Sequence, residues 1–366
     1  MLTTILIFVV VLAILILSHE AGHAVVAWLS GCRVEEFGIG FPPKIFGKKI
    51  GETIFSVNAL PLGGFVRITG EDNESGDEKK PKEERDSRSF ANKSTLIKLC
   101  ILLAGVAMNV LLAFICYTLI AGIGADVPAG TKGGENTIHN KRVEIVSVEE
   151  NAVLSKADIL DGDVLKKVNG EEVFDSETVA NRIKSFSGHE LPLVLLRGEE
   201  TKETILVFDG NHEVGKSVGL SLLDVATYRV SWWQAPIEGA KSTAHVVKMT
   251  AAGIGGLFSD LIWKREVPQD VAGPVGIATL VGSIGRQGIL PLMELVAVLS
   301  VNLALINILP IPALDGGRAL FVLMESTGVR FFRGKPERMA HTIGFALLIL
   351  LVLLITINDI RRIIHP

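Results

Sequence analysis

Four stretches of the chain are apolar over a length that suits a membrane-spanning helix. They are Leu2 to Leu29, Leu99 to Ile123, Leu292 to Leu314 and Ala340 to Ile357. Each approaches or exceeds the roughly 20 residues that a helix needs to cross a hydrocarbon core. Composition agrees, because 48% of the residues are hydrophobic and only 21% are charged. The pattern predicts a polytopic α-helical membrane protein with about four transmembrane helices.

The polar segments divide the chain into regions of different character. We expect the first transmembrane helix at 1–30, a β-region at 31–70, a charged cytoplasmic loop at 71–94 and the second helix at 95–124. A soluble domain at 140–224 and an amphipathic or interfacial connection at 230–286 should follow. The third helix is expected at 288–317, a cytoplasmic loop at 318–339 and the fourth helix at 340–359.

The soluble domain alternates strand-like and helix-like segments. Its run from Gly162 to Gly170, Gly-Asp followed by a five-residue strand and Asn-Gly, resembles the turn-strand-turn core of a PDZ domain. Another small sandwich is the alternative. PDZ domains bind peptides by strand addition, so this domain either binds a peptide or blocks bulky substrates. Trp232 and Trp233 after it favour an interfacial position for the connection, with packing against the soluble domain as the alternative.

Basic residues predict the orientation. The connection from Arg33 to Lys98 carries twelve Lys and Arg, and the one after the third span carries five more. The positive-inside rule places both connections in the cytoplasm, and the termini and the soluble domain outside. Arg361 and Arg362 after the last span cut against this, but two connections outweigh one short tail. The net charge of −4 argues against nucleic acid as a partner.

The first span carries the motif His19-Glu20-x-x-His23. On a helix, two His residues four positions apart lie on one face and are spaced to bind one zinc ion. The Glu between them can act as a general base. Because ionisable side chains at membrane depth are costly and usually functional, the motif predicts zinc-dependent hydrolysis in or at the edge of the membrane.

A catalytic zinc site needs a third protein ligand, and Asp315 at the end of the third span is the best candidate. Pro310 and Pro312 break the helix just before it, and Gly316-Gly317 are expected to let the backbone bend. Non-helical backbone at this depth is tolerated where it lines a cavity. An ordinary carboxylate at a helix end is the alternative for Asp315.

The β-region at 31–70 has two interpretations. It is either a small cytoplasmic hairpin, or a sheet that dips toward the active site with an edge free to pair with an extended peptide. Its strand-like runs are Val34 to Gly40, Thr53 to Val57 and Phe65 to Ile68, separated by glycines and prolines.

Together these motifs resemble the site-2 protease family, in its bacterial regulated-intramembrane-proteolysis subgroup (the RseP/RasP type). The resemblance rests on the zinc motif and on Asn307-x-x-Pro310-x-Pro312-x-Leu314-Asp315-Gly316 in a later span, in that order. Phe37 to Phe41 and Leu60 to Val66 resemble the family's membrane-reentrant β-region, which implies that the β-region at 31–70 is membrane-reentrant. Gly273 to Ile277 resembles the family's segment before the third span, so the resemblance extends over the whole chain.

The resemblance implies a zinc endopeptidase that cleaves transmembrane segments. Zn2+ would be held by His19, His23 and Asp315, with Glu20 as the base. Asn307, Gly63 and Gly64 would bind the unwound substrate backbone.

The resemblance also implies the partners and the location. Substrates would be single-span membrane proteins already trimmed by a site-1-type protease, such as anti-sigma factors or remnant signal peptides. The enzyme would be a multi-pass protein of the bacterial cytoplasmic membrane, with its active site near the cytoplasmic side and the PDZ-like domain extracytoplasmic. The chain has one PDZ-like domain where the best-known Gram-negative pattern has two.

Two other classes of protein compete with this prediction. A catalytically silent membrane scaffold that binds peptides through its PDZ-like domain would lack some of the catalytic groups, yet all four are present. A metal transporter would carry ionisable residues along several spans, and the interiors of the second and fourth spans have none. Glu294 could replace Asp315 as a ligand, but it lies at the wrong end of its span.

Overall fold

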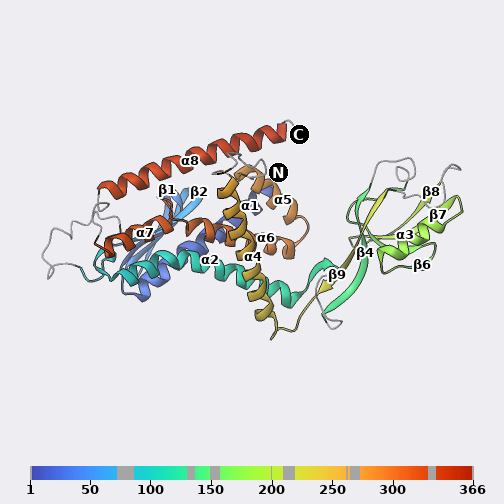
Figure 1. The fold of residues 1–366 in the computed structure, drawn as a ribbon, viewed down its shortest axis with the longest axis horizontal. Coiled ribbons are helices and arrows are strands. Elements are labelled where there is room, and N and C mark those ends of the chain that lie inside the picture. The colour runs from blue at the N-terminus through green and yellow to red at the C-terminus, as the bar shows by residue number, and fades with distance from the viewer. Residues whose placement is uncertain are drawn as a thin grey trace. The chain divides into compact units, whose positions relative to one another are not determined.

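The computed structural model describes residues 2–71, 86–129, 137–148, 157–198, 200–208, 219–260, 263, 273–328 and 335–364. Most of the charged loop expected at 71–94 lies outside these residues. The chain forms two compact units, which Figure 1 shows with their elements labelled. We call Met1–Ile120 with Pro236–Pro366 the helical unit and Ala121–Ala235 the sheet unit.

Within the described residues, four helices are long and apolar enough to cross a membrane. They lie in α1 (Leu2–Leu29), α2 (Thr95–Ile123), α6 (Ile289–Asn307) and α8 (Lys335–Ile364). This confirms the prediction of a polytopic membrane protein. Most apolar side chains along α8 are exposed, as expected for a helix that faces lipid.

The third span ends earlier than the sequence pattern predicts. The predictions of one helix over 288–317 and a loop over 318–339 are both wrong in part. Helix α6 ends at Asn307, and a second helix, α7 (Asp315–Ser326), follows a turn. The physical reason is Pro310, which has no N–H to continue the helix and disfavours helical backbone in the residue before it.

The β-region is built from two long bent strands, β1 (Val34–Ile50) and β2 (Thr53–Ile68). Residues 34–39 of β1 pair antiparallel with 54–57 of β2 on one side and with 64–68 on the other. Among the described residues, the segment 64–68 is therefore an edge of this sheet. Both strands contact α1, so the edge lies beside the helix that carries the zinc motif. The short helix η3 (Phe90–Asn92) precedes α2.

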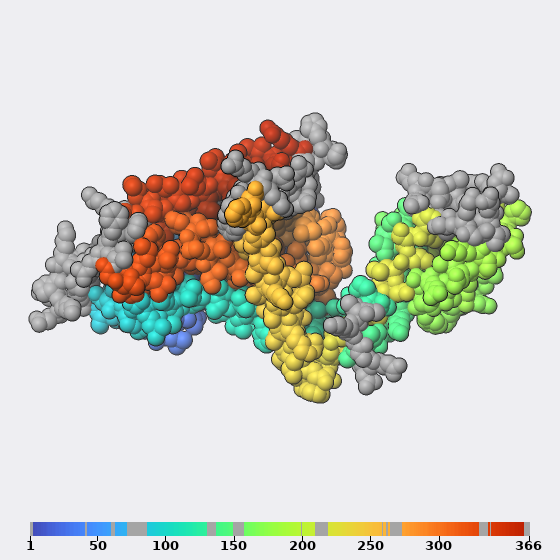
Figure 2. Space-filling view, in the orientation of Figure 1, coloured from blue at the N-terminus to red at the C-terminus, as the bar shows by residue number. Residues whose placement is uncertain are grey.

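The connection expected at 230–286 contains two helices, α4 (Ala235–Ser259) and α5 (Pro274–Gly285). Figure 2 shows α4 in yellow on the face turned to the viewer, with most of its residues exposed. Helix α5 contacts α1 at Gly282, where a Cβ atom would lie closer than 3.0 Å to the side chain of Thr4. The interfacial position of this connection stays a prediction.

A buried carboxylate ties α8 to α5. Asp359 of α8 accepts hydrogen bonds from the backbone N–H groups of Gly273 and Gly276, at 3.1 and 2.8 Å. These groups lie at the start of α5, where the N–H groups have no partner within the helix. The contact thereby connects the exposed last span to the helix that packs on α1.

The sheet unit is one antiparallel sheet with a helix. The strands follow the order β3-β9-β4-β5-β7-β8, with β6 paired to β5. The elements are β3 (Ala125–Pro128), β4 (Ile138–Val148), β5 (Val164–Val168), β6 (Glu171–Glu172), α3 (Ser176–Ser185), β7 (Glu190–Arg197), β8 (Glu200–Val207) and β9 (Leu220–Tyr228).

Alternation along the strands builds the core of the sheet unit. In β7, Leu191, Leu193 and Leu195 are buried, and they alternate with more exposed residues. Helix α3 adds Val179 and Ile183 from one of its faces to the same core. Substantial sheet is thus part of this membrane protein, while the likeness of the unit to a PDZ domain stays a prediction.

Asp163 and Arg197 form an ion pair in the sheet unit. The guanidinium donates two hydrogen bonds of 2.8 Å to the carboxylate, and the Leu160 N–H donates a third of 2.9 Å. Burial opposes the charge on Asp163, but these hydrogen bonds outweigh it and hold the pKa of the carboxyl below its usual range. The folded unit therefore favours the ionised form of Asp163.

We expect Asp163→Ala to destabilise the sheet unit by about 2 kcal/mol, because the Leu160 N–H loses its acceptor and Arg197 keeps only its contacts with Asp158. A depressed pKa contributes stability above the unfolded value of about 4, and this is lost as pH falls through the folded pKa. Hydrogen exchange of the β5 and β7 amides in the full chain measures the difference, which should shrink in acid. The exposed Glu171→Ala serves as control, and a difference that stays constant with pH would contradict the assignment.

Candidate metal centre

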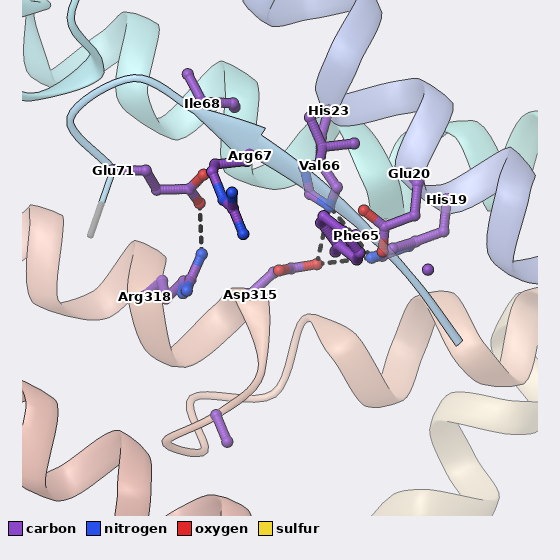
Figure 3. A pocket seen from close by; sticks show the side chains of 12 residues that line it. His19, Glu20, His23, Phe65, Val66, Arg67, Ile68, Glu71, Asp315 and Arg318 are labelled. Atoms are coloured by element: carbon purple, nitrogen blue, oxygen red, sulfur yellow. Dashed lines mark hydrogen bonds and ion pairs between the residues drawn. The ribbon is translucent and has the colours of Figure 1, made fainter. Parts of the chain in front are cut away.

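Three side chains able to bind a metal ion converge on one point. Nε2 of His19 lies 3.2 Å from Nε2 of His23, and Oδ2 of Asp315 lies 2.9 and 3.4 Å from these two atoms. Figure 3 shows the carboxylate pointing at both imidazoles. The three side chains are only 10, 12 and 18% exposed. Within the described part of the chain, this is the cluster of His, Cys, Asp or Glu side chains with ligand geometry.

The chemistry of this donor set fits a divalent cation. Two imidazole nitrogens and a carboxylate oxygen face one another, and Oδ2 of Asp315 is buried without a further hydrogen-bond partner. Lone pairs this close in a dry site repel unless a cation or protons lie between them. Two His and one carboxylate, with a position left open for water, is the donor set of catalytic zinc sites.

The helix α1 positions the two histidines. It runs unbroken from Leu2 to Leu29, so residues four apart lie on one face. Glu20 follows His19 directly, and its side chain lines the same cavity as both histidines. Helical periodicity alone therefore accounts for the position of both histidines on one face of α1, and their role as zinc ligands stays a prediction.

Asp315 reaches the histidines because α7 begins with it. The turn between α6 and α7 is held by Ala313, whose backbone has a positive φ of 80° and whose N–H donates a 2.8 Å hydrogen bond to Nδ1 of His341. A carboxylate in the first helical turn is also stabilised by the helix dipole. The turn thus places the carboxylate of Asp315 beside the two imidazoles, and the dipole favours its charged form.

The expectation that Gly316 and Gly317 let the backbone bend is wrong. Both residues lie inside the first turn of α7 and neither has a positive φ. A Cβ on Gly316 would come closer than 3.0 Å to the carbonyl oxygens of Ile308 and Leu309, and one on Gly317 would do so at Ile311. These glycines are needed for close packing of α7 on the preceding turn, and not for a bend.

A cavity of about 410 Å³ opens beside His19, His23 and Asp315. The edge segment 64–68 of β2 lines one side of it. Gly64 lets this segment approach α1, since a Cβ there would lie 2.9 Å from Ile16 and 3.1 Å from the Glu20 side chain. Gly63 is not among the lining residues and has a φ of 150°. The cavity is lined by His19, Glu20, His23, Gly64, Phe65, Val66, Arg67, Ile68, Glu71, Ala313, Asp315 and Arg318.

Asn307 is the last residue of α6, and its Nδ2 lies 3.4 Å from Nε2 of His19. The structure therefore brings Asn307 to the cluster of His19, His23 and Asp315. Glu294, the rival ligand, is exposed in the first turns of the same helix and is not part of the cluster.

Two groups at this site are not predicted by the sequence pattern. An ion pair between Arg318 and Glu71 lies at the margin of the cavity (Figure 3) and joins residues far apart in the chain. On α2, Asn109 contacts His19, and Gly105 lies so close to both histidines that a Cβ there would overlap their rings. Small residues in an apolar span are a signal of close helix packing, and that signal alone could have drawn attention to Gly105.

Gly105→Ala should displace both histidines, because a Cβ there would lie closer than 3.0 Å to ring atoms of His19 and His23. We expect zinc affinity to fall at least about 10-fold, and overpacking to cost about 1–3 kcal/mol. Chelator competition measures the first effect and thermal unfolding the second. Gly253→Ala on α4 is the control, since nothing lies within 4 Å of that position. Wild-type zinc affinity in the Gly105 variant would contradict the packing argument.

Comparison with known proteins assigns the class that this site defines, a membrane metallopeptidase. The model of peptidase family M50 matches residues 7–351. A relative from Clostridium perfringens is 33% identical over 94% of this chain and 95% of its own. Zinc metalloprotease RasP of Geobacillus kaustophilus is 29% identical, with coverage of 99% and 98%, and regulator of sigma-W protease RasP of Bacillus subtilis is 26% identical, with 98% of both chains covered.

The chain belongs to peptidase family M50, the site-2 protease family. It is a site-2-type zinc metalloprotease, and its cofactor is Zn2+. The sequence-based expectations of the family, the enzyme class and the metal are confirmed.

Proposed function

We propose that this enzyme hydrolyses peptide bonds within the transmembrane segments of single-span membrane proteins. The observation that carries the proposal is the position of the cluster formed by His19, His23 and Asp315. Its two histidines lie on an apolar helix long enough to span a membrane, and the cluster lies beside a cavity lined by a strand edge that is unpaired among the described residues. Ionisable side chains at membrane depth are costly and are usually retained for a function there. Their place on such a helix therefore favours a substrate that is itself in the membrane.

Each catalytic residue has a distinct role in this proposal. His19, His23 and Asp315 hold Zn2+, which supplies Lewis acidity for a water molecule and a peptide carbonyl when bound. Glu20 takes the proton of the attacking water and passes it to the nitrogen of the leaving amine. Its place in the cavity beside the ligands supports this role.

The edge segment 64–68 is proposed to hold the substrate extended. Its open side lines the cavity, so an unwound peptide that pairs with it would run past Glu20. Gly64 contributes by letting the edge approach α1. Gly63 and Asn307 are proposed to contact the same peptide, Asn307 through the amide that now faces His19.

The site is proposed to lie near the cytoplasmic face of a bacterial cytoplasmic membrane. The zinc motif is in the second half of α1, and Arg33 to Lys98, with its twelve basic residues, follows that helix. The sheet unit is then extracytoplasmic. We infer that it is PDZ-like and restricts access to substrates shortened by an upstream, site-1-type protease.

The natural substrates are proposed to be membrane-anchored anti-sigma factors or remnant signal peptides. The name of the Bacillus subtilis relative, regulator of sigma-W protease, supports a substrate that controls a sigma factor.

Cleavage of two matched single-span substrates in detergent tests this function. They share one apolar segment and differ in their extracytoplasmic part, a short stub in one and a folded domain in the other. We expect chelator-sensitive cleavage of the stub substrate, at a bond inside the apolar segment by mass spectrometry. Equal cleavage of both substrates would contradict the proposal that the sheet unit restricts access by size. Zinc-loaded enzyme that cleaves neither, nor any of several others, would favour the silent scaffold.

A further inference from the structure

Helix α2 supports both histidines from the side opposite Asp315. Nδ1 of His23 lies 2.8 Å from the carbonyl oxygen of Ile101, and Nδ1 of His19 lies 3.4 Å from Nδ2 of Asn109. Each imidazole therefore has one nitrogen toward Asp315 and the other toward α2.

Two glycines bring the helices close enough for these contacts. A Cβ on Gly105, midway between Ile101 and Asn109, would overlap both imidazole rings, and one on Gly22 would overlap the Ala104 carbonyl. Without a side chain at 105, the Ile101 carbonyl is accessible to His23 while it remains in the helix. The close packing of α1 and α2 thus depends on a glycine in each helix, Gly22 and Gly105.

Metal binding through Nε2 requires the proton of each imidazole to be on Nδ1. The Ile101 carbonyl can only accept, so it fixes this form of His23. For His19 the neighbour is an amide, whose oxygen and nitrogen are interchangeable by rotation about the terminal side-chain bond. Oδ1 of Asn109 is buried without a hydrogen-bond partner among the described residues. Rotation of the amide would give this oxygen the Nδ1–H of His19 as its donor.

We propose that Asn109 is a positioning residue of the metal centre: its side-chain oxygen accepts the Nδ1–H of His19 and keeps Nε2 free to bind zinc. The proposal rests on the zinc site described above. Asn109 is fully buried where α2 meets α6, since Ser300 donates a 2.9 Å hydrogen bond to its backbone carbonyl. An apolar residue would avoid the unsatisfied oxygen there, so stability alone does not explain an amide at this position.

The test compares Asn109→Leu, which has no acceptor, with Asn109→Asp, which keeps one. Zinc affinity is measured by chelator competition, and unfolding temperature is measured with and without zinc. We expect the leucine variant to bind zinc about 10–100-fold more weakly, the range typical of partners that orient a metal-binding His. The aspartate variant should retain zinc. Asn302→Leu is the control, because Asn302 is a partly buried amide in α6 that pairs with Thr250 and not with a histidine.

The unfolding temperatures separate positioning from a structural role. The metal-free leucine variant should be at least as stable as the metal-free wild type, and only the rise on adding zinc should shrink. Loss of metal-free stability with an unchanged rise would overturn the proposal, as would equal weakening of zinc binding in both variants. Absence of zinc binding by the wild type through His19 and His23 would overturn the metal site itself, which is a different result.

Discussion

Glutamine in place of Glu20 should leave zinc bound to the protein while it abolishes peptide hydrolysis. Glutamine has nearly the same shape as glutamate and fits the contact with Gly64 on β2. It removes only the oxygen that takes a proton, and loss of a general base typically costs about 10²–10⁴-fold in rate. None of the three converging ligand atoms belongs to Glu20. Zinc content by elemental analysis and cleavage of the stub substrate, measured on the same preparation, give the two readouts.

The matched control is Glu294→Gln on α6. Glu294 is also a carboxylate in a spanning helix, but it is exposed and lies outside the cavity. This variant should cleave like the wild type and shows whether loss of a carboxylate from a span harms the enzyme in general. If Glu20→Gln kept more than about a tenth of the wild-type rate, its role as the base would be refuted. Loss of zinc from Glu20→Gln would instead assign it a part in metal binding.

The sequence predicts those parts of the site that depend on local rules. The spacing of His19 and His23 needs only helical periodicity, and the four spans need only length and hydrophobicity. The pairing of Asp315 with them is a long-range prediction. It can be made because a carboxylate next to a helix break in an apolar span is costly unless a cation or another polar group pairs with it.

The remaining parts depend on distances between elements that no local pattern encodes. Gly64, Gly105 and Gly316 are needed because another element passes within van der Waals contact of each. A single sequence shows only that a glycine is present and suggests flexibility, which is the wrong reason at Gly316. Helix α7 is not predicted for a similar reason. Pro310 and Pro312 indicate where a helix ends, but they do not indicate that a new helix begins directly after the turn.

Alanine in place of Asp315 should reduce zinc affinity by more than about 100-fold. Residues that only hydrogen-bond to a ligand are worth about 10–100-fold, and a direct ligand should be worth more. Oδ2 of Asp315 lies within 3.4 Å of Nε2 of each histidine. Without this carboxylate the ion would lose one of its three ligand atoms and the negative charge that offsets its own in a mostly buried site. Isothermal titration of the metal-free protein with zinc measures the loss.

Asp315→Asn distinguishes the charge of the side chain from its shape. The amide keeps an oxygen near the histidines but removes the negative charge, so its zinc affinity should fall between those of the wild type and Asp315→Ala. Asp359→Asn is the matched control, because Asp359 is another carboxylate at a span and binds the start of α5. It should lower the unfolding temperature and leave zinc affinity unchanged. Wild-type zinc affinity in Asp315→Ala would refute the third ligand, since the ion would then be held by the two histidines or by a group outside the cluster.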